Sequence, residues 1–331
     1  MKQFKEFEDI INSLVNESEN YIIFNDGKAI RKNLDEKVLI TLDNICESQF
    51  RKDCENDIIK NSSFWATVNI ENDVNIKCIY LNDEESNMTY FYNIKKGINV
   101  NIVNIYLEFS CSTNVLVEYN VGEAASLNVC DFSSVKCEIN EFNNYYLEEN
   151  SKLILNNLKV NDNLVNGKYN VYLLKKYAEC IINNSIINAS GLKQAYNYVV
   201  HHLYRLTKSE LIGYGVSKNE SILNIDTNGI IKKGAARSEM HQKSKGIILD
   251  LTSTISASPL LEIDEFDCMA SHGASIGAID ESDLFYLMSR GLPREQSQNL
   301  IINGFFNPYL SKLKDEGLIK YISEVIKEHI E

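Results

Sequence analysis

The chain has 331 residues, of which 33 are Lys or Arg and 46 are Asp or Glu, giving a formal net charge of −13. With 44% hydrophobic residues it can bury a core, and its acidic balance excludes a general binder of the nucleic-acid backbone. No apolar run is long enough to span a membrane, and acids within the apolar N-terminus do not match a secretory signal, so we expect a cytoplasmic protein without membrane insertion.

Residues 1–60 are predicted to form a small cap of mixed or helical structure. Apolar residues recur at helical spacing near the N-terminus, at Phe4, Phe7, Ile10, Ile11 and Leu14. The apolar segment 21–24 then runs into Asn25-Asp26-Gly27, which is a tight-turn signal, and residues 39–42 are a second short strand candidate. These signals describe a cap that packs on a larger core.

Residues 61–279 are predicted to form that core, because the apolar pattern changes there to a period of two. The alternation is clear at Val100 and Ile102 and again at Val115 and Val117. Such short strands follow one another without a convincing helix between them, and Gly and Pro turns are scarce, which is unusual for a hairpin-rich sheet. The pattern favours a parallel β-helix, with a β-sandwich as the alternative.

Asparagine and cysteine are both distinctive in this core. The chain has 40 Asn, and 27 of them lie between Asn61 and Asn197. Asn tolerates left-handed backbone angles, so in a parallel β-helix it can turn the corner of a coil and stack on Asn of the next coil. The eight cysteines form no Cys-x-x-Cys pair, and we interpret all except Cys268 as reduced packing residues.

Residues 280–331 are predicted to form a compact helical domain. Asp280 is an N-cap candidate for a first helix, and Gly291 is its expected C-terminal stop. Pro293 suits the first turn of a second helix, and Asn307-Pro308 repeats that start signal before a third.

One segment near the C-terminus is much more specific than the rest. It holds P-L-L-E-I from Pro259, S-H-G-A from Ser271, I-D-E from Ile279, L-F-Y-L-M-S-R-G from Leu284 and I-I-N-G-F from Ile301. In order and spacing these pieces resemble the SufB/SufD family of iron–sulfur cluster assembly scaffolds. The resemblance implies a mostly β protein with a right-handed parallel β-helix core, a small N-terminal cap and a C-terminal helical domain.

The resemblance also implies a branch of the family. The form with Gly273 after the histidine is typical of SufD, whereas SufB proteins usually have H-E-A there. SufB proteins also use a cysteine six residues before the P-x-x-E element as a sulfur acceptor, and this chain has Ser253 at that place. Because a serine cannot accept a persulfide, the chain looks like SufD, a non-catalytic scaffold subunit and not an enzyme.

His272 is the leading site residue. The family's corresponding histidine lies at the interface with SufB and is implicated in cluster formation, and imidazole is a good ligand for iron. Many SufD proteins have a cysteine two residues before it, where this chain has Ala270, and the nearest thiol is Cys268. These three residues would share one face of a strand. The resemblance thus implies iron or an iron–sulfur cluster, held transiently and shared with a partner, with His272 and Cys268 as candidate ligands.

Two protein partners follow from the resemblance. A SufB-like chain would pair with the last strands of the β-helix, and the SufC ATPase would dock on the C-terminal helices. The partner contacts are predicted at Leu284, Phe285, Tyr286, Arg290 and Gly291. No G-x-x-x-x-G-K-[ST] loop occurs in the chain, so we expect nucleotide to bind to SufC and not to this subunit.

Other polar features are interpreted without a specific role. His201 and His202 look like a metal pair, but adjacent residues of a strand point to opposite faces. Arg237, His241, Lys243 and Lys245 form a modest basic patch, which is interpreted as solvated.

Two alternative functions stay open. The chain could be the single scaffold type of a reduced pathway, working as a homodimer with SufC, although Ser253 in place of a thiol weighs against this. It could also be a β-helix enzyme acting on carbohydrates, with acids such as those at 83–85, Glu262 and Asp264 across a glycosidic bond.

Overall fold

The computed structural model describes residues 10–16, 18–36, 40–43, 64–107 and 109–330. Phe4 and Phe7 of the predicted N-terminal helix, and Cys46 and Cys54, lie outside the described residues. The described part of that helix covers residues 10–14.

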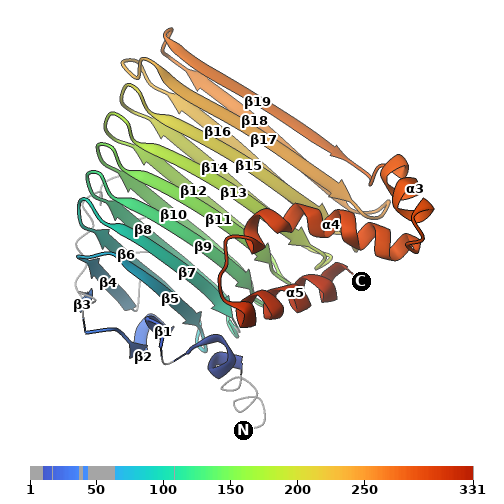
Figure 1. The fold of residues 1–331 in the computed structure, drawn as a ribbon, viewed down its shortest axis with the longest axis horizontal. Helices are drawn as coiled ribbons and strands as arrows, with labels where there is room; N and C mark the ends of the chain where they lie inside the picture. Colours follow the sequence, from blue (N-terminus) through green and yellow to red (C-terminus); the bar gives the residue numbers. More distant parts are fainter. Residues whose placement is uncertain (1–9, 17, 37–39, 44–63, 108, 331) are drawn as a thin grey trace.

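Two long sheets make up most of the fold (Figure 1). Sheet A contains β1(Tyr21–Asn25), β2(Lys28–Asn33), β5(Val74–Leu81), β7(Asn99–Leu107), β9(Ser126–Ser134), β11(Lys152–Val160), β13(Glu179–Asn188), β15(Lys208–Ser217), β17(Ser238–Ile248) and β19(Cys268–Gly277). Sheet B contains β3(Ile40–Asp43), β4(Phe64–Ile70), β6(Ser86–Ile94), β8(Thr113–Val121), β10(Ile139–Leu147), β12(Val165–Leu173), β14(Lys193–His202), β16(Ile222–Ile231) and β18(Thr254–Ile263).

Successive strands alternate between the two sheets, so that each coil contributes one strand to each. From β5 in sheet A and β4 in sheet B onward, every strand pairs in parallel with the strand two positions along the chain. Antiparallel pairing among the described strands is confined to β1 with β2 and β3 with β4, at the first coils. The parallel β-helix is therefore confirmed and the β-sandwich is wrong. The division at residues 60 and 279 stays a prediction.

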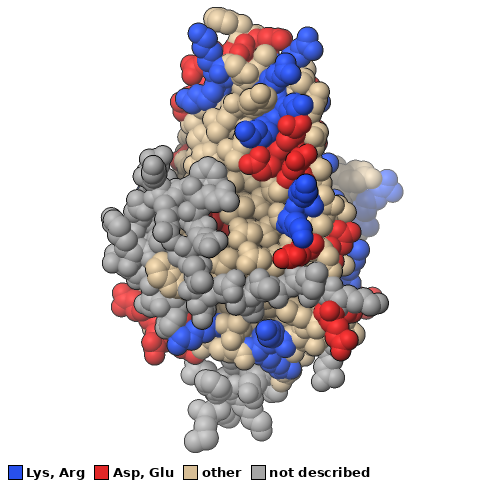
Figure 2. Space-filling view, turned by 90° about the vertical axis from the view of Figure 1, so that its left-hand side faces the viewer, with Lys and Arg blue, Asp and Glu red and all other residues tan. Residues whose placement is uncertain are grey.

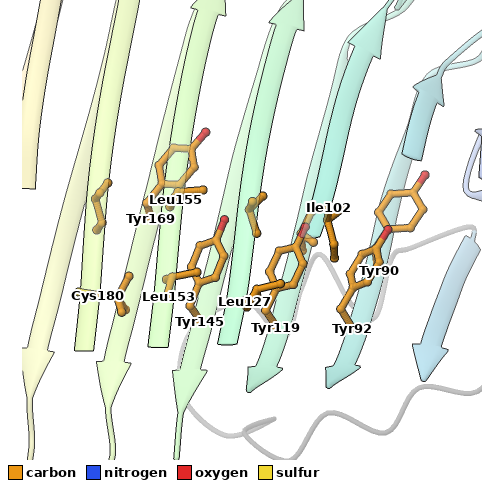
Figure 3. Packing of buried hydrophobic residues seen from close by; sticks show 14 of the residues in the cluster. Tyr90, Tyr92, Ile102, Tyr119, Leu127, Tyr145, Leu153, Leu155, Tyr169 and Cys180 are labelled. Atoms are coloured by element: carbon orange, nitrogen blue, oxygen red, sulfur yellow. The ribbon is translucent and has the colours of Figure 1, made fainter. Parts of the chain in front are cut away.

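The space between the sheets, which we call the lumen, holds the main core. Tyrosines stack along it from coil to coil, with ring centroids 4.8 Å apart between Tyr92 and Tyr119 and 4.9 Å apart between Tyr119 and Tyr145 (Figure 3). Leucines and valines of sheet A pack against them, including Leu127 and Leu153. Offset aromatic stacks add to the free energy of apolar burial, so the tyrosine column ties neighbouring coils together.

A buried charge network lies in the same lumen. Lys159 Nζ is 2.9 Å from Glu141 Oε2, and their side chains are 1% and 6% exposed. Tyr169 donates a hydrogen bond to the same carboxylate. Burial raises the pKa of Asp131 to about 6, although attraction to Lys159 and a hydrogen bond from Asn104 act in the opposite direction. The network keeps otherwise costly buried charges paired.

Helices cover the outer face of sheet A (Figure 1). After β19 the chain forms α3(Glu281–Ser289), α4(Arg294–Leu310) and α5(Glu316–Ile330). Apolar residues of α4 and α5, such as Phe306 and Ile322, pack with outward residues of sheet A, such as Leu158 and Val160. Lys77 of β5 fastens this layer, since its ammonium lies 2.6 Å from Asp315 Oδ2 between α4 and α5.

The helix boundaries confirm part of the prediction. Asp280 caps α3 by accepting a hydrogen bond from the Ser282 amide, and Gly291 follows the helix with a left-handed φ of 94°. The start signal at Asn307-Pro308 is wrong, because both residues lie within α4, and the third helix begins at Glu316. Burial of Phe306 and Tyr309 against sheet A continues α4 past the proline, which by itself would favour a break.

The asparagines stack mainly along strands. On sheet A a hydrogen-bonded row joins the side-chain amides of successive coils, with 2.7 Å between Asn101 Nδ2 and Asn75 Oδ1, and the row continues through Asn128, Asn156 and Asn183. Asparagine also turns corners, since Asn150 and Asn219 have φ values of 57° and 60°. The predicted coil-to-coil stacking is therefore confirmed, although the rows lie on strand faces.

The turns that lead from sheet B to sheet A form a charged ridge. Figure 2 views this side of the molecule and shows basic and acidic side chains interspersed, without a large region of one sign. Ion pairs join successive coils, such as Lys176 with Glu149 at 3.0 Å. Exposed pairs of this kind contribute little to stability but keep the ridge polar. Among the described residues, no helix is long and apolar enough to cross a membrane.

Candidate functional site

The last coil leaves the β-helix open at one end. β18 and β19 stand at the ends of their sheets, so each is hydrogen-bonded to a strand of its own sheet on one side only in the described chain. Their residues are mostly exposed, in contrast to the buried strands of earlier coils. An unpaired strand edge is a template for another strand, and natural proteins usually cover or charge such an edge.

His272 lies on β19 at this open end and points across the lumen. It is in register with Gln242 of β17, which is buried and faces the lumen. The Nδ1 atom of His272 is 2.9 Å from the backbone oxygen of Pro259 in β18. Because a carbonyl oxygen can only accept, Nδ1 donates this hydrogen bond, and Nε2 is the ring nitrogen that a metal could bind. A backbone carbonyl thus orients the ring as in protein metal sites.

Cys268 shares the inward face of β19 with His272, as predicted. It is in register with Ser238, which is fully buried in the lumen. Cys268 lies four positions before His272, which corresponds to about 13 Å along a strand. The thiol instead lies 3.3 Å from the Glu265 oxygen, and burial together with Glu265 and Asp267 raises the pKa of Cys268. A single ion therefore cannot bind both side chains of this chain.

Ser253 has a clear structural role. It is 5% exposed, and its hydroxyl lies 2.9 Å from Asp250 Oδ2 and accepts a hydrogen bond from the Ser221 amide. These contacts hold the turn that enters β18. The position at which the resemblance places a sulfur acceptor in SufB is thus a buried, fully hydrogen-bonded serine.

His201 and His202 point to opposite faces of β14. His202 is buried in the lumen, where its ring nitrogens lie 2.8 Å from Thr207 Oγ1 and 2.7 Å from Ser209 Oγ. His201 stacks on Tyr172 outside. Burial lowers the pKa of each histidine to about 4. The prediction that these histidines do not form a metal pair is consistent with this geometry.

The predicted partner residues of α3 divide into two groups. Leu284 is 1% exposed and packs in the core beneath the helix, so it cannot contact a partner, and its prediction is corrected. Phe285 and Tyr286 are 74% and 58% exposed, and the Arg290 guanidinium lies 5.4 Å from the Tyr286 ring centre. An exposed aromatic pair on one short helix is a typical protein-binding surface.

Sequence reasoning missed the group that orients the histidine. In the sequence Pro259 only begins a motif, yet its carbonyl accepts the hydrogen bond that orients the His272 ring. The contact crosses from one sheet to the other, so no local pattern could have revealed it. Within the described residues, no group of three or more His, Cys, Asp and Glu side chains could hold a metal ion.

Comparison with known proteins agrees with this geometry. Residues 82–305 match the family model described as "SUF system FeS cluster assembly, SufBD core domain". The chain is 34% identical over 129 residues to the iron–sulfur cluster assembly protein SufD of Bacillus subtilis, which covers 39% of this chain and 30% of that protein. It is 33% identical over 93 residues to SufD of Escherichia coli, covering 28% and 22% of the two chains.

A third relative is the iron–sulfur cluster assembly SufBD family protein of Archaeoglobus fulgidus, 34% identical over 125 residues, or 38% of this chain and 32% of that one. The chain thus matches about a third or less of the length of these curated relatives. The family model, however, spans more than half of the chain and includes both open-end strands. The chain belongs to the SufBD family of the SUF iron–sulfur cluster assembly system.

Proposed function

We propose that this protein is a SufD-like scaffold subunit that pairs with a SufB-like chain and the SufC ATPase in the cytoplasm. In this role it turns over no substrate of its own. Its cargo is iron or a nascent iron–sulfur cluster, held transiently where the open end of the β-helix meets the partner. The observation that carries the proposal is His272, whose Nδ1 is held by the Pro259 carbonyl at the open end of the β-helix, beside two free strand edges.

The donor set supports a shared site. His272 offers one nitrogen, and Cys268 is too far along the strand to join it at the same ion. One imidazole is too few ligands for iron or a cluster, which bind four or more. The other ligands must then come from a second chain, and the exposed edges of β18 and β19 provide the surface on which that chain would bind.

The helical layer supports the second partner. Phe285 and Tyr286 are exposed on α3, which follows β19 directly. An Arg294–Glu281 ion pair of 2.6 Å joins α3 to the long helix α4. A protein that moved α3 would therefore act close to the strand that carries His272. The ATPase would supply the nucleotide chemistry that this chain lacks.

The decisive experiment replaces the histidine in a reconstituted complex. We expect His272→Ala to leave assembly of the three chains unchanged and to lower the iron and sulfide content of the complex severalfold. His201→Ala is the matched control, because His201 lies outside the lumen on β14, where its ring stacks on Tyr172. The cluster content is measured by iron and sulfide analysis and by anaerobic absorption spectra. Equal cluster content in wild type and His272→Ala would remove this residue from the proposal.

The carbohydrate enzyme is not supported by the acid positions. Glu262 accepts a hydrogen bond of 2.6 Å from Asn228, and Asp264 lies 3.9 Å from Lys232 on the turn ridge. Asp83 accepts a hydrogen bond from Asn25 at the opposite end of the β-helix. A glycosidase needs two carboxylates that face each other across the bond to be cleaved, and these acids do not meet that need.

A further inference from the structure

A strip of basic residues lies on the outer face of sheet A, one strand in from the open edge. His241, Lys243 and Lys245 occupy alternate positions of β17 and are all exposed. Alternate residues of a strand point to the same face and are spaced about 6.6 Å apart. We call these three residues the β17 strip.

The edge strand leaves the strip uncovered. The β19 residues in register with it are Ser271, Gly273 and Ser275, none of which has a long side chain. A Cβ atom added to Gly273 would meet nothing within 4 Å. Together these strands line a shallow groove of about 560 Å³. The long lysine side chains can therefore reach over β19 toward whatever lies beside its edge.

The charge of the strip is not neutralised by the described part of the chain. Neither Lys243 nor Lys245 forms an ion pair there, whereas Lys208 of the preceding strand is paired with Glu239 at 3.1 Å. Glu210 lines the same groove next to His241, and the strip with this acid still has a positive balance.

We propose that the β17 strip recognises an extended acidic segment of the SufB-like chain, added as a strand to the edge of β19. This inference rests on the proposed function and specifies the partner's chemistry. The backbone of the added strand would pair with the free edge of β19. Its side chains on the outer face would be Asp or Glu at alternate positions, because their spacing then matches that of the lysines.

The same geometry disfavours a second copy of this chain as the occupant. A copy that paired through its own β19 would present Ser271, Gly273 and Ser275, with no acid to meet the lysines. It would also bring its own Lys243 and Lys245 toward those of the first chain, and like charges across a junction are destabilising. The strip therefore selects a different, acid-bearing chain, which argues against the homodimeric scaffold.

Charge reversal on the full-length protein tests this inference. The dissociation constant for the purified SufB-like chain of the same organism is measured for wild type and for Lys243→Glu/Lys245→Glu, at low and at high salt. We expect the variant to bind about tenfold more weakly or worse at low salt, with a smaller difference at high salt. The affinity of Lys243→Gln/Lys245→Gln should lie between that of wild type and that of Lys243→Glu/Lys245→Glu.

The matched control is Lys175→Glu/Lys233→Glu, which makes the same charge change on the turn ridge seen in Figure 2. It should bind like wild type. Equal binding by wild type and the β17 strip variants would overturn the inference and leave the proposed function standing. Failure of wild type to bind the SufB-like chain would overturn both. Concentration-dependent dimers of wild type that persist in Lys243→Glu/Lys245→Glu would also contradict the inference.

Discussion

The middle and the open end of the β-helix use the same strand geometry for different purposes. In the middle coils the lumen is filled by large aromatic side chains, and each strand is paired on both sides. At the open end the inward positions of β19 are small or polar, as at Ala270, His272 and Ala274, and the edges are free. Buried side chains are thus concentrated in the middle coils, and free strand edges are found at the open end.

The difference has a simple physical origin. A coil in the middle buries its apolar residues against neighbours on both sides, whereas the last coil has a neighbour on one side only. The last coil can therefore expose backbone and side-chain groups that an inner coil must satisfy internally. A partner that added a strand would convert the open end into something closer to an inner coil.

The largest expected effect on the free energy of unfolding comes from removing a tyrosine ring from the lumen. Tyr119 is 1% exposed and stacks between Tyr92 and Tyr145, so Tyr119→Ala should destabilise the protein by about 3–5 kcal/mol. Met269→Ala, at the open end where Met269 is 60% exposed, should cost less than about 0.5 kcal/mol. Urea unfolding followed by circular dichroism measures both. Similar losses for the two variants would contradict the contrast between middle and end.

Ion pairs should show the same contrast. Lys159→Met leaves the carboxylate of Glu141 buried without its cation and should destabilise the protein by about 3–5 kcal/mol. Arg294→Met breaks a pair whose side chains are 51% and 72% exposed and should cost far less, because solvent screens exposed ion pairs. The double variant Lys159→Met/Glu141→Gln should recover much of the loss. No recovery in urea unfolding would mean that packing, and not the unpaired charge, causes the effect.

The smallest of these effects is a pH dependence from the lumen. The pKa of His202 is lowered to about 4 by burial, whereas an unfolded histidine titrates near 6.5. Between these values the unfolded chain binds more protons, so stability should fall as the pH drops from about 6.5 toward 4, by up to about 3 kcal/mol.

Two further groups shape that profile. His201 acts in the same direction, since its pKa is also lowered to about 4. Asp131 acts in the opposite direction, because its folded pKa is raised to about 6 and the folded state gains the proton first as the pH falls. The difference between wild type and His202→Gln isolates the His202 contribution. If stability changed with pH in the same way for both proteins, His202 would have no such contribution.

The sequence predicted those features that depend on neighbouring residues. The alternation around Val115 and Val117 identified half-buried strands, and Asp280 and Gly291 identified the bounds of α3. The motif around His272 indicated the family that the comparisons support. Such signals are readable because strand alternation and helix capping are decided within a few residues.

Only the tertiary structure decided what lies across from each residue. Parallel register places a residue beside others some 25–35 positions away, and no local pattern fixes that pairing. The register places Lys243 beside Gly273, so the basic patch that the sequence suggested lies next to small residues of the edge strand. It also placed His272 against the carbonyl of Pro259 on the opposite sheet. The sequence by itself determined the strands and the motif. The coiling of those strands decided which side chains meet, because contacts between distant residues form only when the coils stack into the β-helix.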